Sequence, residues 1–129
     1  NINNVKIFNQ NILILFELFN FNNMINEVWL LFPDPWPKNR HVKRRLINIS
    51  FIKKISLLLK DKSKIYIATD SVVYLMQILK AFYDSRLFSW INDLPYKWDY
   101  SLNINRKTKY FKQALRKNRK TFILIFQKI

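Results

Sequence analysis

The stretch 30–45 brings together the residue types best suited to chemistry. Asp34 stands between two prolines, and a cluster of bases follows it at Lys38, Arg40, His41, Lys43, Arg44 and Arg45. Lysine and arginine bind phosphate groups, and a fixed carboxylate favours positive charge that develops beside it. The stretch therefore predicts a place where an anionic partner is held and Asp34 is presented to it. From residue types alone, a structural turn aspartate beside proline is an equal alternative.

Other residues besides Asp34 and the bases that follow it are candidates for binding. Asp70 follows the apolar run 64–69 and precedes Ser71, a residue type that caps helices. Trp36 has a ring that can stack on a nucleobase, and packing at the core or rim is an equal alternative. A second group of cations either extends a nucleic-acid surface or is merely solvated: Lys107, Lys109, Lys112, Arg116, Lys117, Arg119 and Lys120.

The element that positions Asp34 is the apolar run 27–32. This run is apolar on both faces, which is typical of a central parallel strand. Pro33 and Pro35 end it, because proline cannot donate to a strand ladder. Residues before proline favour extended backbone, so Phe32 and Asp34 are expected to be extended.

The rest of the chain alternates strands with helices. Strands are expected at 4–8, 64–69, 88–91 and 121–126, and helices at 12–19 (buried), at 42–60 and after Ser71. One apolar face of the third helix is expected to carry Val72, Leu75, Met76, Leu79 and Phe82. The short polar run 61–63 is expected to end the second helix before the next strand begins. This order predicts an α/β fold with a mostly parallel sheet and helices on both faces. Ligands of open α/β sheets bind beyond the carboxyl ends of the strands, where Asp34 and Asp70 are expected.

Composition limits the classes of function. The length of 129 residues predicts a single domain, 1–129, and the net charge of +15 predicts salt-dependent binding to nucleic acid. An AT-rich coding bias would account for part of the lysine excess. With no cysteine, no glycine and one histidine, the chain has no disulfide, no glycine-rich phosphate loop and no cysteine or histidine-rich metal site. No apolar run approaches the roughly 18 residues of a membrane span, so we expect a cytoplasmic, metal-independent protein.

The motif Phe-Pro-Asp-Pro-Trp at 32–36 is followed by a lysine two residues on, then by Arg-His and a Lys-Arg-Arg run. This pattern resembles that of the bacterial tRNA (guanine-N7)-methyltransferases. The resemblance continues at 68–70, where the family has a substrate-contacting aspartate, and at 108–110, near a Thr-Lys-Tyr/Phe-Glu motif. Residues 4–11 resemble the strand and loop whose acidic residue reaches the adenine of S-adenosylmethionine.

The resemblance implies a partial Rossmann-like class I methyltransferase fold. It implies methyl transfer from S-adenosylmethionine to guanine N7 in the variable loop of tRNA. Neutral guanine already has a lone pair at N7, so positioning supplies most of the acceleration. The implied roles are catalytic for Asp34, cofactor-binding for Asn11 and Asp34, substrate-binding for Lys38, Asp70 and Thr108, and RNA-binding for Arg40, His41, Lys43, Arg44 and Arg45.

It also implies that the domain is N-terminally incomplete. In the family, a glycine-rich turn and an acidic residue that bind most of the cofactor precede the matched part, and this chain begins at Asn1. Asn11 stands where the family has an acid, although its side-chain oxygen can still accept a hydrogen bond from an adenine amino group. Phe111 stands where the motif has glutamate. One alternative is therefore a catalytically inactive tRNA-binding remnant, and another is a general basic RNA-binding protein in which Asp34 has no special role.

Overall fold

The computed structural model describes residues 3–18, 22–100 and 107–129. Its elements, in chain order, are α1 (Ile12–Leu18), β1 (Ile25–Leu31), the 3-10 helix η1 (Asn39–Arg44), α2 (Ile49–Leu58), β2 (Leu59–Thr69), α3 (Val72–Ser85), β3 (Phe88–Trp90), the 3-10 helix η2 (Pro95–Lys97), α5 (Lys109–Arg116) and β4 (Phe122–Lys128). Strands thus form where the apolar runs at 27–32, 64–69, 88–91 and 121–126 predicted them.

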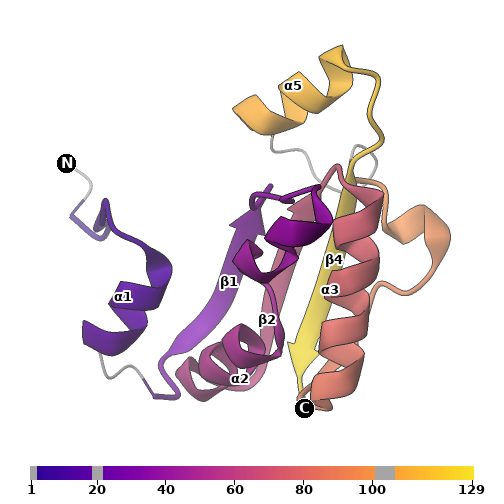
Figure 1. Cartoon of the computed structure of the whole chain (residues 1–129). Helices are drawn as coiled ribbons and strands as arrows, with labels where there is room; N and C mark the ends of the chain where they lie inside the picture. The colour runs from indigo at the N-terminus through magenta and orange to yellow at the C-terminus, as the bar shows by residue number, and fades with distance from the viewer. Residues whose placement is uncertain (1–2, 19–21, 101–106) are drawn as a thin grey trace.

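The four strands form one sheet in the order β1-β2-β4-β3. β1 pairs with β2 in parallel, whereas β4 runs antiparallel to both β2 and β3. The predicted α/β class is confirmed, but the expectation of a mostly parallel sheet is wrong. The reason is visible in Figure 1: α5 lies beyond the carboxyl ends of β1 and β2, and the chain enters β4 from that end and runs back.

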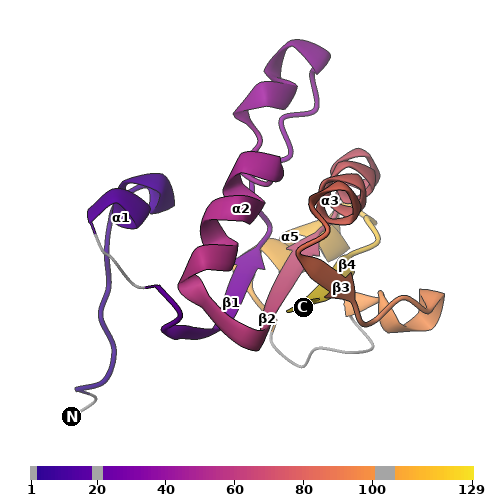
Figure 2. The same cartoon turned by 90° about the horizontal axis from the view of Figure 1, so that it is seen from below.

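One face of the sheet carries the main core. α2 and α3 lie side by side on this face (Figure 2). Alternate strand residues such as Ile65, Ile67 and Leu124 are fully buried beneath them, as the twofold periodicity of strands requires. On the opposite face, Ala68 and Ile123 pack with Tyr100 and with Phe111 of α5. Among the described helices, only α5 contributes buried residues to this second face, so the expected helices on both faces are only partly present.

The N-terminal expectations are partly wrong. The predicted strand at 4–8 is absent, and Val5 and Ile7 are 63% and 91% exposed. In the described sheet β1 is one of the two edge strands, and no described segment pairs with its free edge. The helix at 12–18 is present, but none of its residues is buried. It contacts the rest of the protein through Phe16, whose ring centroid lies 5.8 Å from that of Phe51.

The predicted helix at 42–60 is divided into η1 and α2. The side-chain oxygen of Asn48 accepts a hydrogen bond from the N–H of Phe51 (3.0 Å) and so caps α2 at its first turn. The cations of 38–45 therefore precede α2 and do not occupy its first turn. The chain also continues as β2 through the expected break at 61–63, with Lys62 in the left-handed region (φ 63°) where the pairing with β1 shifts register.

α3 begins as the sequence predicts. The Ser71 hydroxyl oxygen accepts a hydrogen bond from the N–H of Tyr74 (3.2 Å). Leu75 and Phe82 are buried as expected, but Val72 and Met76 are 59% and 61% exposed. Tyr74 and Ile78 are buried instead, so the buried face is turned relative to the prediction. In the described ranges, no helix has the length and apolarity needed to cross a membrane.

Tyr74 fixes α3 to the segment that precedes α2. Its hydroxyl oxygen accepts a hydrogen bond from the backbone N–H of Ile47 (3.0 Å), and both residues are fully buried. Burial raises the pKa of the Tyr74 hydroxyl, so the group stays protonated through neutral pH. This bond sets the position of the chain between η1 and α2.

The substitution Tyr74→Phe is expected to lower the free energy of unfolding by about 1–3 kcal/mol, because the buried N–H of Ile47 loses its acceptor. Urea denaturation followed by circular dichroism measures the change. The control is Tyr110→Phe, which removes a hydroxyl from a ring that is 59% exposed and is expected to change stability little. Equal stabilities for the two variants would contradict this role of Tyr74.

Candidate functional site

The loop that follows β1 bends sharply at two residues. The N–H of Phe32 still donates to the carbonyl oxygen of Ala68 (2.9 Å), which continues the pairing of β1 with β2. Phe32 then adopts a left-handed backbone (φ 54°), and Trp36 does the same (φ 41°). The expectation of an extended Phe32 is therefore wrong. These conformations are costly for bulky residues and persist only where the surroundings impose them.

Arg45 imposes the shape of this loop. Its side chain is 4% exposed, and its guanidinium donates to the carbonyl oxygens of Pro35 (2.7 Å) and Trp36 (3.2 Å) and to the side chain of Gln77. The same group lies over the ring of Tyr74, 5.4 Å from its centroid. A buried charge is tolerated only when it is well bonded, so Arg45 ties the loop of Asp34 to α3.

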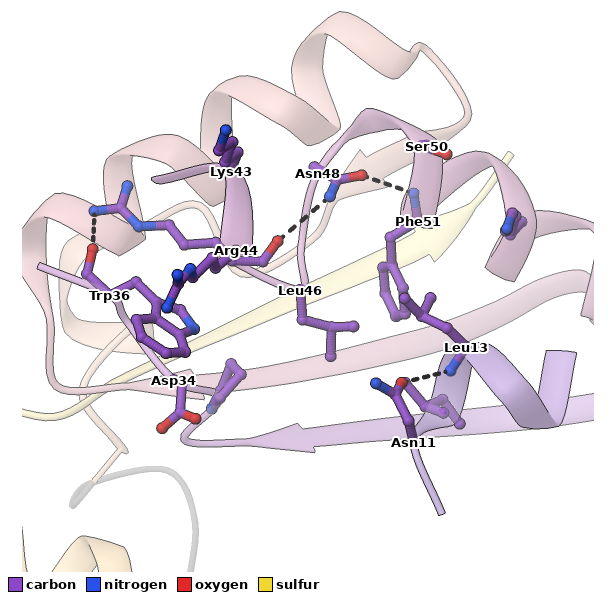
Figure 3. Close-up of a pocket in the computed structure, with 14 residues that line it drawn as sticks. Asn11, Leu13, Asp34, Trp36, Lys43, Arg44, Leu46, Asn48, Ser50 and Phe51 are labelled. Atoms are coloured by element: carbon purple, nitrogen blue, oxygen red, sulfur yellow. Dashed lines mark hydrogen bonds between the residues drawn. The ribbon is translucent and has the colours of Figure 1, made fainter. Parts of the chain in front are cut away.

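One cavity, here called the α1 cavity, opens between this loop and the start of α1. Its volume is about 440 Å³, and Figure 3 shows Asn11 on the α1 side and Asp34 and Trp36 on the loop side. The predicted cofactor residues Asn11 and Asp34 are thus brought to one cavity. Its lining is Asn11, Ile12, Leu13, Pro33, Asp34, Trp36, Lys43, Arg44, Arg45, Leu46, Asn48, Ser50, Phe51 and Lys54.

Asn11 also caps α1. Its side-chain oxygen accepts a hydrogen bond from the N–H of Leu13 (2.9 Å). One lone pair of that oxygen is therefore used within the protein, and the predicted contact to an adenine amino group would have to share the same atom. The amide NH₂ of Asn11 has two further donors.

A second, smaller cavity lies on the other side of Asp34, and is here called the α5 cavity. Its volume is about 140 Å³, and its lining is Phe32, Pro33, Asp34, Pro35, Asp70, Tyr110, Gln113, Ala114, Lys117 and Arg119. The two acids predicted to lie at the strand ends, Asp34 and Asp70, meet here. Pro33 and Asp34 belong to the lining of both cavities, and Asp34 is exposed.

Asp70 is held by an ion pair. Its carboxylate accepts a hydrogen bond from the Arg119 guanidinium at 2.8 Å, and its side chain is 19% exposed. Ser71 performs the capping of α3, so Asp70 is not needed for that role. The pair fixes one oxygen of Asp70 and joins the end of β2 to the segment that leads into β4.

Thr108 and Lys38 are placed differently from the two acids. The Thr108 hydroxyl oxygen accepts a hydrogen bond from the N–H of Phe111 (3.2 Å) and so caps α5. Phe111 is 3% exposed and packs on Tyr100, with ring centroids 4.9 Å apart. Neither Thr108 nor Lys38 lines either cavity. Their predicted contacts with substrate remain predictions.

Two of the predicted RNA-binding residues contact the ring of Trp36. The Arg44 guanidinium lies 5.1 Å from the centroid of the Trp36 ring, and His41 meets the same ring edge to face at 5.5 Å. Arg40, Lys43 and Arg44 are exposed, and none of them forms an ion pair with a described acid. Trp36 is thus half-buried and in contact with η1, whose cation Arg44 is exposed to solvent.

Sequence reasoning missed several residues of the two cavities. Gln113 and Tyr110 line the α5 cavity, and Lys54 and Asn48 line the α1 cavity. Tyr110 lies in the resembled motif at 108–110 but was given no role, and the types and spacing of the other three carried no local signal of a site. Arg119 was expected only as a surface cation, and its partner lies 49 positions away. Across the described residues, no group of three or more His, Cys, Asp or Glu side chains could hold a metal ion.

Comparison with known proteins gives the relatives of this chain. A family model described as "Putative methyltransferase" matches residues 1–124. The chain is 42% identical over 88 residues to a protein of Leptospira interrogans named tRNA (guanine-N(7)-)-methyltransferase, a match that covers 68% of this chain and 41% of that protein.

Proteins of the same name from other bacteria match longer parts of the chain. The relative from Buchnera aphidicola is 34% identical over 131 residues, covering 100% of this chain and 53% of its own length. The relative from Bartonella quintana is 34% identical over 107 residues, covering 83% of this chain and 46% of its own length. The chain thus spans about half the length of these curated relatives, or less.

The substitution Arg45→Ala is expected to lower the free energy of unfolding by at least about 2 kcal/mol, because two loop carbonyls and Gln77 lose a charged donor. The matched control, Arg44→Ala, removes an exposed cation over Trp36 and is expected to cost at most about 1 kcal/mol. Chemical denaturation of the two variants measures the difference. Similar losses for both would show that Arg45 does not hold the loop.

Proposed function

Because the chain belongs to the methyltransferase family that matches residues 1–124, we propose that the complete protein transfers a methyl group from S-adenosylmethionine to N7 of a guanine in the variable loop of tRNA. The observation that most directly supports this proposal is the position of Asp34, which lines both the α1 cavity and the α5 cavity. A donor held on one side of this residue and an acceptor base held on the other would meet at its carboxylate.

The α1 cavity fits part of the cofactor. Its volume of about 440 Å³ lies within the range of roughly 300–1,000 Å³ that is usual for small-molecule pockets. Asp34 suits the cationic groups of S-adenosylmethionine, Lys54 suits its carboxylate, and the Asn11 amide suits its adenine edge. The chain has no glycine, so the glycine-rich turn implied by the resemblance lies outside it, and we propose that these residues bind only one side of the cofactor.

The α5 cavity fits one base. Its volume of about 140 Å³ is below the usual range of roughly 300 Å³ and more for larger ligands, so it suits a single ring system. Two acids, Asp34 and Asp70, line it, and their carboxylates can accept the N–H groups of a guanine edge. Arg119 holds one oxygen of Asp70, which leaves its other oxygen for the base.

The proposed mechanism relies on position and charge. When bound, S-adenosylmethionine supplies a methyl group on a cationic sulfur. Guanine N7 has a free lone pair, so no residue needs to remove a proton from it first. Asp34 accepts N–H groups of the base and favours the positive charge that the base gains on methylation. Asp70 fixes the orientation of the base in its plane.

The tRNA backbone is proposed to lie along η1. Arg40, Lys43 and Arg44 are exposed cations of η1, and Arg44 lies over the ring of Trp36. Exposed lysine and arginine bind phosphates. Arg45 is left out of this surface, because it is buried and its guanidinium donates to groups of the protein itself. Binding of this kind is salt-dependent. The proposal includes the cytoplasmic location expected from the sequence.

A tRNA-binding remnant without activity is the second candidate. Phe111, at the position where the resembled motif has glutamate, is buried against Tyr100. It supplies no polar group to the α5 cavity. A remnant of this kind would bind tRNA through the same exposed cations.

The substitution Asp34→Asn in the complete protein is expected to lower the rate of tRNA methylation by about 10²–10³-fold, since it removes a charge aimed at the reacting base. Binding of tRNA is expected to change little. Transfer of labelled methyl groups and filter binding measure the two quantities. The control Asp61→Asn alters a side chain that is 85% exposed at the other end of β2. A wild-type protein that binds tRNA without methylating it would favour the remnant, and an unchanged rate in Asp34→Asn would contradict the proposed catalysis.

Each of the substitutions Arg40→Gln, Lys43→Gln and Arg44→Gln is expected to reduce the slope of log binding constant against log salt by about 1, because each removes about one phosphate contact. Titration of tRNA at several salt concentrations measures the slope. Lys62→Gln, an exposed position at the far end of β2, is the control with an unchanged slope. If Lys62→Gln had the same effect as the other three, binding would depend on total charge alone.

A further inference from the structure

The helix α5 carries three cations and no acid in its eight residues. Lys109, Lys112 and Arg116 are spaced by three and four positions, so they lie on one side of the helix. All three are exposed, and none forms an ion pair with an acid in the parts of the chain that the structure describes. We call these three side chains the α5 cation row. Like charges at this spacing repel one another, so the row does not stabilise the helix that carries it.

The side of α5 opposite this row is used by the fold. Phe111 and Ala114 are 3% and 2% exposed, and Phe111 packs with Ala68 of the sheet. Tyr110 and Leu115 lie on the two flanks of this buried side. A basic helix that binds a membrane surface needs a free apolar side to insert into the lipid. Because the centre of the apolar side of α5 is buried against the sheet, the row suits a polyanion in water and not a lipid surface.

The remaining side of α5 faces the α5 cavity. Tyr110, Gln113 and the C-cap residue Lys117 line this cavity. Gln113 stands four positions after Lys109 and three before Arg116, so it neighbours both on the helix surface. Figure 1 shows α5 beyond the carboxyl ends of β1 and β2, the strands that precede the two acids of the cavity. The α5 cation row therefore runs beside the lining of this cavity.

The cations of η1 border the other cavity. Lys43 and Arg44 line the α1 cavity, whereas the described lining of the α5 cavity includes no residue of η1. In the function proposed above, the target base occupies the α5 cavity. A base held there brings its own sugar and phosphates with it, because they are covalently attached. The exposed cations nearest to that lining along the chain are those of α5.

We propose that the α5 cation row binds the tRNA phosphates next to the target guanosine, while η1 binds the backbone farther along the strand. This inference rests on the proposed function, since it needs the target base in the α5 cavity. Phosphate contacts fix the register and orientation of a nucleic acid, so the row positions the nucleotide whose base meets Asp34. Bound phosphate also relieves the repulsion within the row. Arg119 is not part of it, because Arg119 holds Asp70.

The first test compares the double variant Lys112→Gln/Arg116→Gln with the wild type, as complete proteins binding an unmethylated tRNA transcript. The slope of log binding constant against log salt is expected to fall by about 2, because two phosphate contacts are lost. The matched control Lys60→Gln/Lys62→Gln removes the same charge from exposed positions at the far end of β2 and is expected to keep the slope of the wild type. An unchanged slope in the α5 variant, or an equal fall in the control, would overturn the proposal.

The second test locates the lost contacts on the tRNA by ethylation interference. Ethylation removes the charge of a phosphate, so ethylation next to the target guanosine is expected to weaken binding of the wild type. The α5 variant is expected to be insensitive to ethylation there, and the η1 variant Arg40→Gln/Lys43→Gln is expected to remain sensitive. An α5 variant with the same interference pattern as the wild type would show that the row does not contact these phosphates.

Both tests measure binding and not methyl transfer, so the two proposals can fail separately. A wild type that binds tRNA with the expected interference pattern but transfers no methyl group would refute the proposed function and support the role of the row. Normal methylation with unchanged contacts in the α5 variant would do the reverse. Vesicles containing phosphatidylserine probe the membrane alternative. Binding to these vesicles that is lost in the α5 variant, while its tRNA contacts stay those of the wild type, would also overturn the proposal.

Discussion

The buried guanidinium of Arg45 is the interaction on which the arrangement of the site depends. It donates to the carbonyl oxygens of Pro35 and Trp36 and reaches Gln77 of α3. Removing a charge from water is costly, and these bonds offset the cost only while the loop keeps its shape. The loop in turn holds left-handed conformations at Phe32 and Trp36. The position of Asp34 is therefore set by a buried residue whose guanidinium donates to the loop and to α3.

This constraint explains how one short loop divides the site. The loop leaves β1, carries Asp34 between the α1 cavity and the α5 cavity, and returns to the protein at Arg45. The neighbouring strand contributes Asp70, which Arg119 holds from the segment before β4. Two parallel strands thus lead to the acids, while the segment before the antiparallel strand β4 supplies the cation that holds one of them. The exposed cations of η1 are left to face solvent.

Several features could be predicted from the sequence because their signals are local. The apolar run of β1, the helix cap at Ser71 and the placement of Asp34 at a strand end each follow from a few adjacent residues. The direction of β4 could not be predicted, since an apolar run has the same pattern in parallel and antiparallel strands. Arg44 and Arg45 have the same chemistry in sequence, yet one is exposed and the other is 4% exposed. That difference and the Asp70–Arg119 pair arise only from tertiary packing.

The central claim is that Asp34 separates a cofactor cavity from a base cavity. A crystal structure of the complete protein with S-adenosylhomocysteine and a guanosine nucleotide tests it most directly. The account predicts the adenosyl ligand beside Asn11 and the guanine beside Asp70, with the carboxylate of Asp34 within hydrogen-bond distance of the guanine. A guanine bound away from Asp34, or the adenosyl ligand bound outside the α1 cavity, would contradict it.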